Sequence, residues 1–242
     1  MTTVKPYDLK GESKKSEVRR MFNSIAPRYD LLNHLLSAGI DRYWRRRTIG
    51  LLRGLANPLV LDMATGTGDL AIKAHKMLGC RAIGADLSAQ MLEVARQKID
   101  ERGLQQYISV VEADSENLPF ADGSFDAVTV AFGVRNYENL DKGLSEMVRV
   151  LKPGGLIAIL EFSKPRVFPF RQLYMLYFRH VLPALGGLVS KDKSAYRYLP
   201  QSVMQFPDGR EFEQHLEQAG ARPVRRISLT CGIATIYLGQ KQ

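Results

Sequence analysis

A glycine-rich segment, Asp62-Met-Ala-Thr-Gly66-Thr67-Gly68-Asp69, has the residue types of a ligand-binding loop. It follows a short apolar run and precedes a helical pattern, which predicts a strand, a glycine turn and a helix in succession. Glycines let a ligand approach the backbone closely, and the first turn of a helix presents free N–H groups. Asp86 ends the next predicted strand, where a carboxylate can accept two ribose hydroxyls. Together these residues predict a site for an adenosyl ligand.

Two kinds of adenosyl ligand are compatible with this loop. The pattern Gly66-x-Gly68-x-x-Ala71 satisfies the dinucleotide fingerprint, so an NAD-dependent oxidoreductase is one interpretation. Asp62 and Asp69 flank the loop, however, and carboxylates there would repel a pyrophosphate and attract a cation. Asp114 and Ser115, predicted on the third strand, add to the acidic character. S-adenosylmethionine has a sulfonium, an ammonium and no phosphate, so the acidic loop favours it over NAD.

Short apolar runs alternate with helical patterns through the middle of the chain. The predicted strands cover residues 58–63, 80–85, 107–111, 125–130 and 156–162, and the predicted helices cover 70–78, the segment after an N-cap at Ser88, and 140–151. Lys152-Pro-Gly-Gly155 should end the last of these helices. A further helix over 208–219 precedes two strands, 222–229 and 233–238, that form a hairpin at the sheet edge. This order predicts an α/β fold with a seven-stranded, mostly parallel sheet and helices on both faces.

Composition is that of a soluble globular protein. The 242 residues are 45% hydrophobic and 24% charged, which excludes a disordered or fibrous chain. Two cysteines, Cys80 and Cys231, are too few for a disulfide framework and lack zinc-ligand spacing, which favours a reducing cytoplasm. No apolar stretch typical of a secretory signal opens the sequence. Charged residues, proline and glycine interrupt the apolar region 168–189, so no membrane span is expected.

The net charge of +9 indicates nucleic acid or an anionic membrane as a neighbour. An RNA-binding protein is the alternative that the net charge alone suggests, with Arg45-Arg46-Arg47 as its strongest feature. The charge is unevenly distributed, however: residues 1–57 hold 12 basic and 5 acidic residues, 58–163 hold 10 and 15, and 164–242 hold 12 and 5. The acidic centre suits a cationic ligand, and the basic flanks suit an anionic surface.

Two longer motifs resemble those of a known family. The segments Tyr29-Asp-Leu-Leu-Asn33-His-Leu-Leu-Ser37, with Trp44 further on, and Arg149-Val-Leu-Lys-Pro-Gly-Gly-Leu-Ile-Ala-Ile-Leu-Glu161-Phe-Ser163 resemble motifs of the ubiquinone/menaquinone biosynthesis C-methyltransferases. Phe132-Gly-Val-Arg135-Asn136 and Tyr196-Arg-Tyr-Leu-Pro200 are also similar. The resemblance runs from about Val18 to about Leu238, and its central part resembles class I S-adenosylmethionine-dependent methyltransferases.

The resemblance implies a Rossmann-like methyltransferase domain over residues 58–242, with a helical insertion at 164–207 and an N-terminal helical segment, 1–57, that covers the substrate site. The predicted cofactor-binding residues are Asp62, Gly66, Thr67, Gly68, Asp86, Asp114 and Ser115, of which Thr67, Asp86, Asp114 and Ser115 are implied as contacts by the resemblance. Asp41 stands where many members have histidine, which argues against a mechanism that needs a histidine there. Ala131 stands where some members have a serine that contacts the cofactor.

The implied reaction is methylation of a ring carbon in a prenylated quinol, converting demethylmenaquinol to menaquinol. The same chemistry on a methoxy-polyprenyl-benzoquinol of ubiquinone biosynthesis is the alternative. The reaction requires alignment of the two groups, a stabilised phenolate and an acceptor for the ring proton. It needs no metal, and no ligand cluster in the sequence has metal-binding spacing.

Arg135, Asn136 and Tyr196 are the predicted catalytic residues. Arg135 follows the fourth predicted strand, at the sheet edge where ligands bind, and its permanently protonated guanidinium can stabilise a phenolate. The alternative is a surface Arg135 paired with Glu138.

The base and the walls of the quinol pocket have several candidates. The candidates for the base are Tyr196, Tyr198, His34 and His180. The candidate walls are Tyr29 and Asn136, with ordinary packing as the alternative.

The implied partners follow from the chemistry of the substrate. A prenyl tail requires an apolar channel or patch, and aromatic residues gather between Phe168 and Phe178. Basic segments with apolar helices predict peripheral contact with the inner face of an anionic cytoplasmic membrane. No nucleic-acid partner is expected, and a homodimer is one of the oligomeric states left open.

Overall fold

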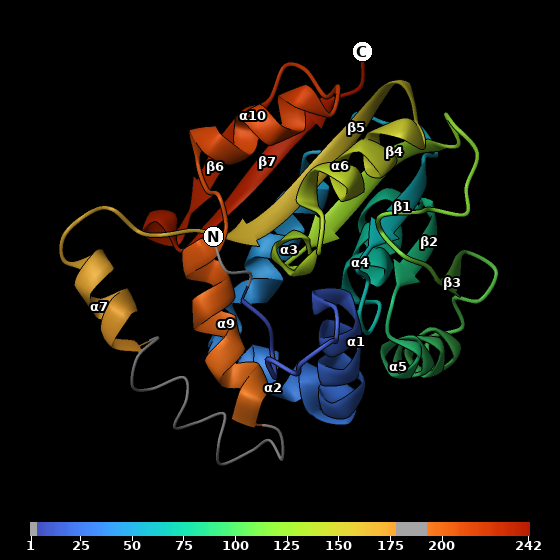
Figure 1. Cartoon of the computed structure of the whole chain (residues 1–242). Helices are drawn as coiled ribbons and strands as arrows, with labels where there is room; N and C mark the ends of the chain where they lie inside the picture. The colour runs from blue at the N-terminus through green and yellow to red at the C-terminus, as the bar shows by residue number, and fades with distance from the viewer. Residues whose placement is uncertain (1–3, 178–192) are drawn as a thin grey trace.

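The structure is a computed structural model that describes residues 4–177 and 193–242, apart from the side chains of Leu32, His34, Leu35, Leu36, Lys193 and Tyr196. Its strands are β1 (Leu59–Met63), β2 (Arg81–Asp86), β3 (Ile108–Glu112), β4 (Phe125–Ala131), β5 (Leu151–Phe162), β6 (Arg225–Leu229) and β7 (Ala234–Gln240). They form one seven-stranded sheet of order β3-β2-β1-β4-β5-β7-β6 (Figure 1). The pairs among β1 to β5 are parallel, whereas β7 is antiparallel to both β5 and β6. The predicted sheet and its C-terminal hairpin are confirmed.

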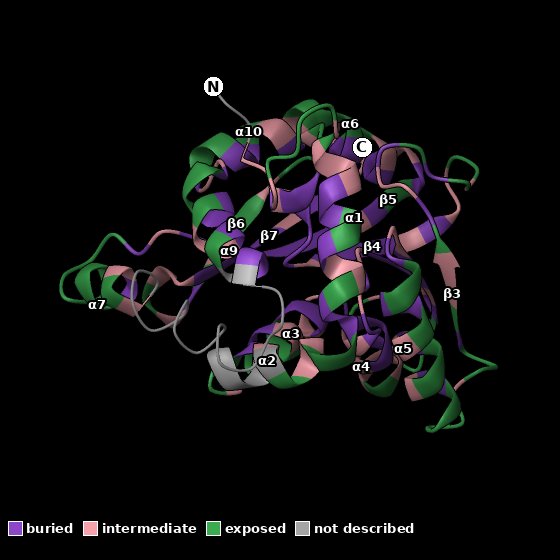
Figure 2. Cartoon of the chain, turned by 60° about the horizontal axis from the view of Figure 1, so that its bottom comes forward, coloured by how far each residue is buried: buried purple, intermediate pink, exposed green. Residues whose placement is uncertain are grey.

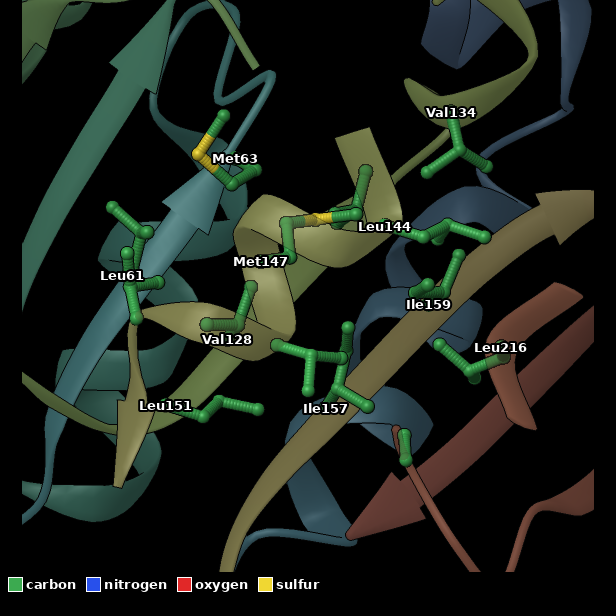
Figure 3. Packing of buried hydrophobic residues seen from close by; sticks show 14 of the residues in the cluster. Leu61, Met63, Val128, Val134, Leu144, Met147, Leu151, Ile157, Ile159 and Leu216 are labelled. Atoms are coloured by element: carbon green, nitrogen blue, oxygen red, sulfur yellow. The ribbon is translucent and has the colours of Figure 1, made fainter. Parts of the chain in front are cut away.

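Each face of the sheet is covered by helices because the strands are apolar on both sides. In β1, Leu61 contributes to one hydrophobic core and its neighbour Val60 to the other. The first core contains residues of α6 (Leu140–Arg149) and α10 (Arg210–Gln218), as Figure 3 shows for Leu144, Met147 and Leu216. The second core contains residues of α3 (Ile40–Gly50), α4 (Asp69–Leu78) and α5 (Ala89–Asp100).

The N-terminal helices pack near the carboxyl ends of the parallel strands. They are α1 (Lys14–Ile25), the 3-10 turn η1 (Ala26–Arg28), α2 (Tyr29–Leu36) and α3. Val18, Met21 and Ile25 of α1 share a core with Met91 of α5 and with α9 (Lys193–Gln205). Trp44 of α3 packs with residues that follow or belong to β4, β5 and β7. The helices thereby bring the chain start close to the sheet edge at which ligands bind in such folds.

After β5 and a connection of residues 163–169, α7 (Phe170–Leu176) projects from the body of the molecule beside α9 (Figure 1). Figure 2 shows that much of α7 is exposed, whereas the sheet is largely buried. Most of the apolar region 168–189 lies outside the described residues. Within residues 4–177 and 193–242, no helix has the length and apolar character needed to cross a membrane.

Two local predictions are corrected by the structure. Lys152-Pro-Gly-Gly155 does not separate helix from strand, because α6 already ends at Arg149 and these residues lie inside β5. The pairing of β5 with β4 is irregular there, Gly154 has φ 76°, and a Cβ at Gly155 would lie 2.9 Å from the Lys152 carbonyl oxygen. Asp114 and Ser115 follow β3, which ends at Glu112, and Asp114 forms an isolated bridge with Asn117.

Candidate active site

The glycine loop turns sharply between β1 and α4. Ala64, Gly66 and Gly68 all have positive φ, at 48°, 56° and 80°, a conformation that costs glycine least. The Thr65 N–H donates to the Ala85 carbonyl, and the Gly66 N–H donates to Oδ2 of Asp86 at 2.8 Å. The loop is therefore held against the end of β2.

A narrow first cavity of about 80 Å³ opens beside this loop. It brings together Gly66, Asp86, Asp114 and Ser115, four of the residues predicted to bind the cofactor. Its charged lining is acidic overall, since Asp86, Asp114, Glu116 and Glu138 outnumber Lys15 and Arg19. This balance suits a cationic ligand better than a pyrophosphate.

Asp86 and Asp114 differ in how their carboxylates are held. Asp86 accepts the Gly66 N–H and, at 2.9 Å, the Ser88 N–H, while burial raises its pKa. Asp114 accepts a hydrogen bond at 2.7 Å from Nζ of Lys15, which comes from α1. The same ammonium contacts Glu116 at 3.2 Å, so α1 is fastened across the first cavity.

Three other predicted cofactor residues, Asp62, Thr67 and Gly68, do not line the first cavity. Asp62 is buried beneath the loop, where it accepts the Thr65 hydroxyl at 2.6 Å, the Thr129 hydroxyl at 2.9 Å and the Ala71 N–H at 3.1 Å. It holds the turn instead of facing a ligand. Burial raises its pKa to about 6.

Asp69, the other carboxylate that flanks the loop, is also held by groups of the protein. Asp69 forms an ion pair with Lys98 of α5, and Thr67 donates its hydroxyl to Asp30 of α2 at 2.6 Å. Lys98 also contacts Asp30 at 2.7 Å. The local spacing alone could not reveal this network, because its members come from three separate elements.

A larger second cavity of about 410 Å³ adjoins the first. The two cavities share Phe22, Tyr29, Phe132 and Asn136 as lining residues. Most of the lining of the second cavity is apolar, from α1, α2, α3, α7 and α9, and the charged residues among it are Asp41, Arg45 and Arg135. An apolar cavity with a few polar groups is typical of a site for an amphipathic small molecule.

Arg135 is almost buried at this second cavity. Its Nη1 lies 2.9 Å from Oε1 of Glu161, whose side chain is fully buried at the end of β5. Glu138, the alternative partner considered from the sequence, instead accepts the backbone N–H of Lys14. The alternative of a surface pair with Glu138 is excluded, because Arg135, after β4, pairs with Glu161 of β5.

Two buried polar atoms of this turn have no hydrogen-bond partner within the described part of the chain, namely Nε of Arg135 and Oδ1 of Asn136. Buried polar groups are almost always satisfied, and an orphan costs about 1–3 kcal/mol. Both residues also line the second cavity, although these two atoms themselves are buried below its surface. Asn136 lies on the boundary of the two cavities.

The candidate bases are only partly placed. Tyr196 lies on α9, but its side chain is outside the described residues, as is that of His34 and the whole of His180. Tyr198 is buried and lines a third cavity with Arg135, and burial raises the pKa of its hydroxyl. Tyr29, predicted as a pocket wall, lines both main cavities, and burial raises its pKa as well.

Sequence reasoning missed Glu161 and Arg45 as parts of the site. Glu161 lies within a family motif, and nothing local in the sequence links it to Arg135, 26 positions earlier. Arg45 is one of three adjacent arginines, and the signal that could have identified it is its spacing from Asp41, which is that of an ion pair on one helix face. Among residues 4–177 and 193–242, no group of three or more His, Cys, Asp and Glu side chains could hold a metal ion.

This sheet order, with a glycine loop after β1 and a carboxylate ending β2, defines the class I S-adenosylmethionine-dependent methyltransferase fold. An S-adenosylmethionine-dependent methyltransferase from Aquifex aeolicus has a similar structure, with a TM-score of 0.59 and 20% identity over 81% of this chain and 89% of that one. The [4+2]-cyclase SpnF is similar with a TM-score of 0.67 and 16% identity, over 94% and 96%. Likeness at this level shows the fold and leaves the reaction open.

Sequence similarity is more specific. Residues 10–241 match the ubiE/COQ5 methyltransferase family, and the chain belongs to this family. It is 48% identical to the demethylmenaquinone methyltransferase of Bacteroides fragilis over 98% of this chain and 97% of that protein. It is 46% identical to the ubiquinone/menaquinone biosynthesis C-methyltransferase UbiE of Geotalea daltonii over 94% and 97%. The relative from Thermus thermophilus, a demethylmenaquinone methyltransferase, is 48% identical over 91% and 100%.

Proposed function

We propose that this protein is an S-adenosylmethionine-dependent C-methyltransferase that converts a prenylated demethylmenaquinol to the menaquinol. The observation that carries the proposal is the contact between an acidic cavity beside the glycine loop and an apolar cavity containing Arg135. Transfer requires the methyl donor and the acceptor carbon to meet at the boundary of two such sites. The names of relatives at 46–48% identity support the substrate class.

The residues around the first cavity fit this donor. Asp86 lies at the end of β2, where it can accept ribose hydroxyls, and Asp114 and Ser115 lie beside it. At Gly66 the backbone is open to the cavity, since the ring of Tyr29 at 3.7 Å is the nearest group that a Cβ would meet. S-adenosylmethionine supplies a methyl group attached to a sulfonium cation. The surrounding carboxylates would favour such a cation over an anionic dinucleotide.

The chain contributes alignment and electrostatic stabilisation to the acceptor. A quinol ring carbon becomes nucleophilic when the adjacent hydroxyl is ionised, and the Arg135 guanidinium can stabilise that phenolate at the cavity wall. Glu161 fixes the guanidinium without supplying a base, because its side chain is buried against Arg135. Asn136 lines both cavities, so its side chain can orient the ring at their boundary. After the carbon–carbon bond has formed, a base accepts the proton that leaves the ring. The predicted candidates for this base include Tyr196.

Methylation of a methoxy-polyprenyl-benzoquinol is the alternative, supported by the double name of the Geotalea relative. We test both by incubating the protein with deuteromethyl-labelled S-adenosylmethionine and the short-chain form of each reduced quinol. Mass spectrometry and NMR should find the label on a ring carbon of the naphthalene-type product, formed together with S-adenosylhomocysteine. A label on oxygen, or no transfer to either quinol, would refute the proposed reaction. Preferential labelling of the benzoquinol would select the alternative.

We also propose that α7 contacts an anionic membrane surface, from which the quinol reaches the second cavity. Phe170, Leu173 and Tyr174 of α7 line that cavity. On or before the same helix, Val167, Phe168 and Leu176 are 63%, 76% and 57% exposed. Arg166 and Arg171 are exposed nearby. An apolar helix face edged by basic residues suits the interface of a bilayer that contains anionic lipids.

A further inference from the structure

A second arginine, Arg45, also lines the second cavity. It has no role in the stabilisation of the phenolate proposed above. The rings of Phe132 and Phe162 lie beside one another with centroids 4.5 Å apart and planes 31° apart. Arg45 lies over Phe132, with 5.7 Å between its Cζ and the ring centroid, and Arg135 lies over Phe162 at 5.5 Å. The two guanidinium groups therefore flank one aromatic pair, each over its own ring.

Arg45 is held in the same manner as Arg135, by a buried carboxylate of its own. Nε of Arg45 lies 3.5 Å from Oδ2 of Asp41, one turn earlier on α3, and the exposed fractions of the two side chains are 11% and 4%. Asp41 also accepts the Ser37 hydroxyl at 2.8 Å. The hydrogen bond to Asp41 is made by Nε, so the two Nη nitrogens of Arg45 lie outside it.

The helix that presents Arg45 is itself fixed in place. Trp44 donates its indole N–H to the Thr230 hydroxyl at 2.8 Å and packs at 5.9 Å from Phe132 and 6.2 Å from Phe162. Desolvating an ion pair in an apolar cavity costs free energy that a hydrophobic pair would avoid. A second such pair at a fixed position is therefore better explained by a polar group on the ligand than by stability.

We propose that Arg45, positioned by Asp41, binds the second hydroxyl of a 1,4-dihydroxy aromatic ring whose first hydroxyl lies at Arg135. The inference rests on the proposed function and extends it to substrate recognition. A quinol has its two oxygens on opposite sides of the ring, and the flanking arginines supply one donor to each. Arg45 then selects diols over rings with a single hydroxyl and fixes which ring carbon faces the first cavity.

A cycle of enzyme variants and substrate variants tests this role. The substrates are a short-chain demethylmenaquinol and 3-prenyl-1-naphthol, which keeps the hydroxyl beside the acceptor carbon and lacks the second one. The preference is the ratio of kcat/KM for the diol to kcat/KM for the naphthol. Arg45→Met removes a charged hydrogen bond to the second hydroxyl, so we expect it to lower this preference by about 10- to 100-fold. Because intrinsic ring reactivity is common to both enzymes, it cancels in the comparison.

Arg46→Met is the matched control, since Arg46 is the exposed neighbour of Arg45 on the same helix and should keep the wild-type preference. Asp41→Asn should lower the preference by a smaller factor and provides the test if Arg45→Met does not fold. Calorimetric titration with S-adenosylmethionine confirms that each variant is folded. An unchanged preference in a folded Arg45→Met or Asp41→Asn variant would overturn the inference. Failure of the wild type to methylate the diol would instead refute the proposed function.

Discussion

Arg135 and Glu161 show how a single charged side chain is made available to a ligand inside an apolar cavity. The Arg135 side chain is 8% exposed and that of its partner Glu161 is fully buried, so the ion pair is largely shielded from bulk water. Nη1 of Arg135 also donates to the Phe132 carbonyl. The side chain is therefore held both by Glu161 and by the backbone of its own turn. A preorganised cation of this kind stabilises a developing negative charge without reorganisation.

Replacing Arg135 by lysine should preserve the charge and remove the planar group that meets Glu161 and the cavity. We expect Arg135→Lys to bind S-adenosylmethionine with wild-type affinity and to lose about 100-fold or more in kcat, because a lysine at a fork-shaped site is not conservative. Calorimetry measures the affinity, and single-turnover transfer to a short-chain quinol measures the rate. An unchanged kcat would remove Arg135 from the mechanism.

Asp62 illustrates a residue that supports the loop from beneath. Its pKa of about 6 is above the ordinary aspartate value because burial disfavours the charged form. The folded protein therefore keeps a proton that the unfolded chain releases as the pH rises from about 4 to about 6. The contribution of this carboxyl to the free energy of unfolding is greatest below that window and is lost above it.

Asp62→Asn should remove this dependence. We expect the stability of the wild type, relative to the variant, to be about 2 kcal/mol more favourable at about pH 4.5 than at about pH 7.5. Urea unfolding of both proteins at the two pH values measures the difference, and titrations common to both proteins cancel. A relative stability that does not change with pH would contradict the raised pKa.

At the scale of elements, the covering helices are attached to the cofactor loop by charged contacts. Lys98 of α5 lies within hydrogen-bond distance of Asp30 at the start of α2, of Asp69 at the start of α4, and of the Thr67 hydroxyl. Its side chain is only 14% exposed. One ammonium therefore joins the helix carrying Tyr29 to the loop carrying Gly66, the two sides of the first cavity.

Lys98→Met should leave Asp30 and Asp69 facing one another without a shared cation. We expect affinity for S-adenosylmethionine to fall about 10-fold or more, and KM for the quinol to rise, because α2 also lines the second cavity. Arg96→Met is the control on the same helix, since the Arg96–Glu93 pair is exposed on both sides and contributes little. Equal effects of the two substitutions on affinity would show that the network does not couple the elements.

At the scale of the whole molecule, the uneven charge acquires a spatial meaning. The acidic middle of the sequence contributes the carboxylates of the first cavity, whereas basic flanking segments supply Lys15, Arg45 and the arginines near α7. The exposed face of α7 lies at one end of the molecule and β3 at the other (Figure 2). A membrane bound at α7 would therefore leave the β3 side of the molecule in solution.

The exposed apolar side chains of Phe168 and Leu176 can be replaced without altering the lining of the second cavity, because neither residue lines it. We expect Phe168→Ser/Leu176→Ser to reduce binding to anionic vesicles about 10-fold or more, and to leave kcat/KM for a short-chain quinol in solution unchanged. Co-sedimentation at low and high salt measures binding, which should weaken as salt rises. Tyr107→Ser, beside β3, is the control, and equal binding by both variants would exclude α7 as the contact.

The sheet, its hairpin, the glycine loop and the carboxylate at the end of β2 can all be predicted from the amino-acid sequence. Apolar periodicity and glycine positions act over a few residues, so they define elements and the sheet edge at which a ligand binds. Which carboxylates face the cavity depends instead on how the elements pack. Asp62 and Asp69 flank the loop in sequence, yet one holds its turn from below and the other pairs with Lys98 of α5. Glu161 and Arg135 likewise meet only because β4 and β5 are neighbours, since side-chain direction depends on packing between segments far apart in the chain.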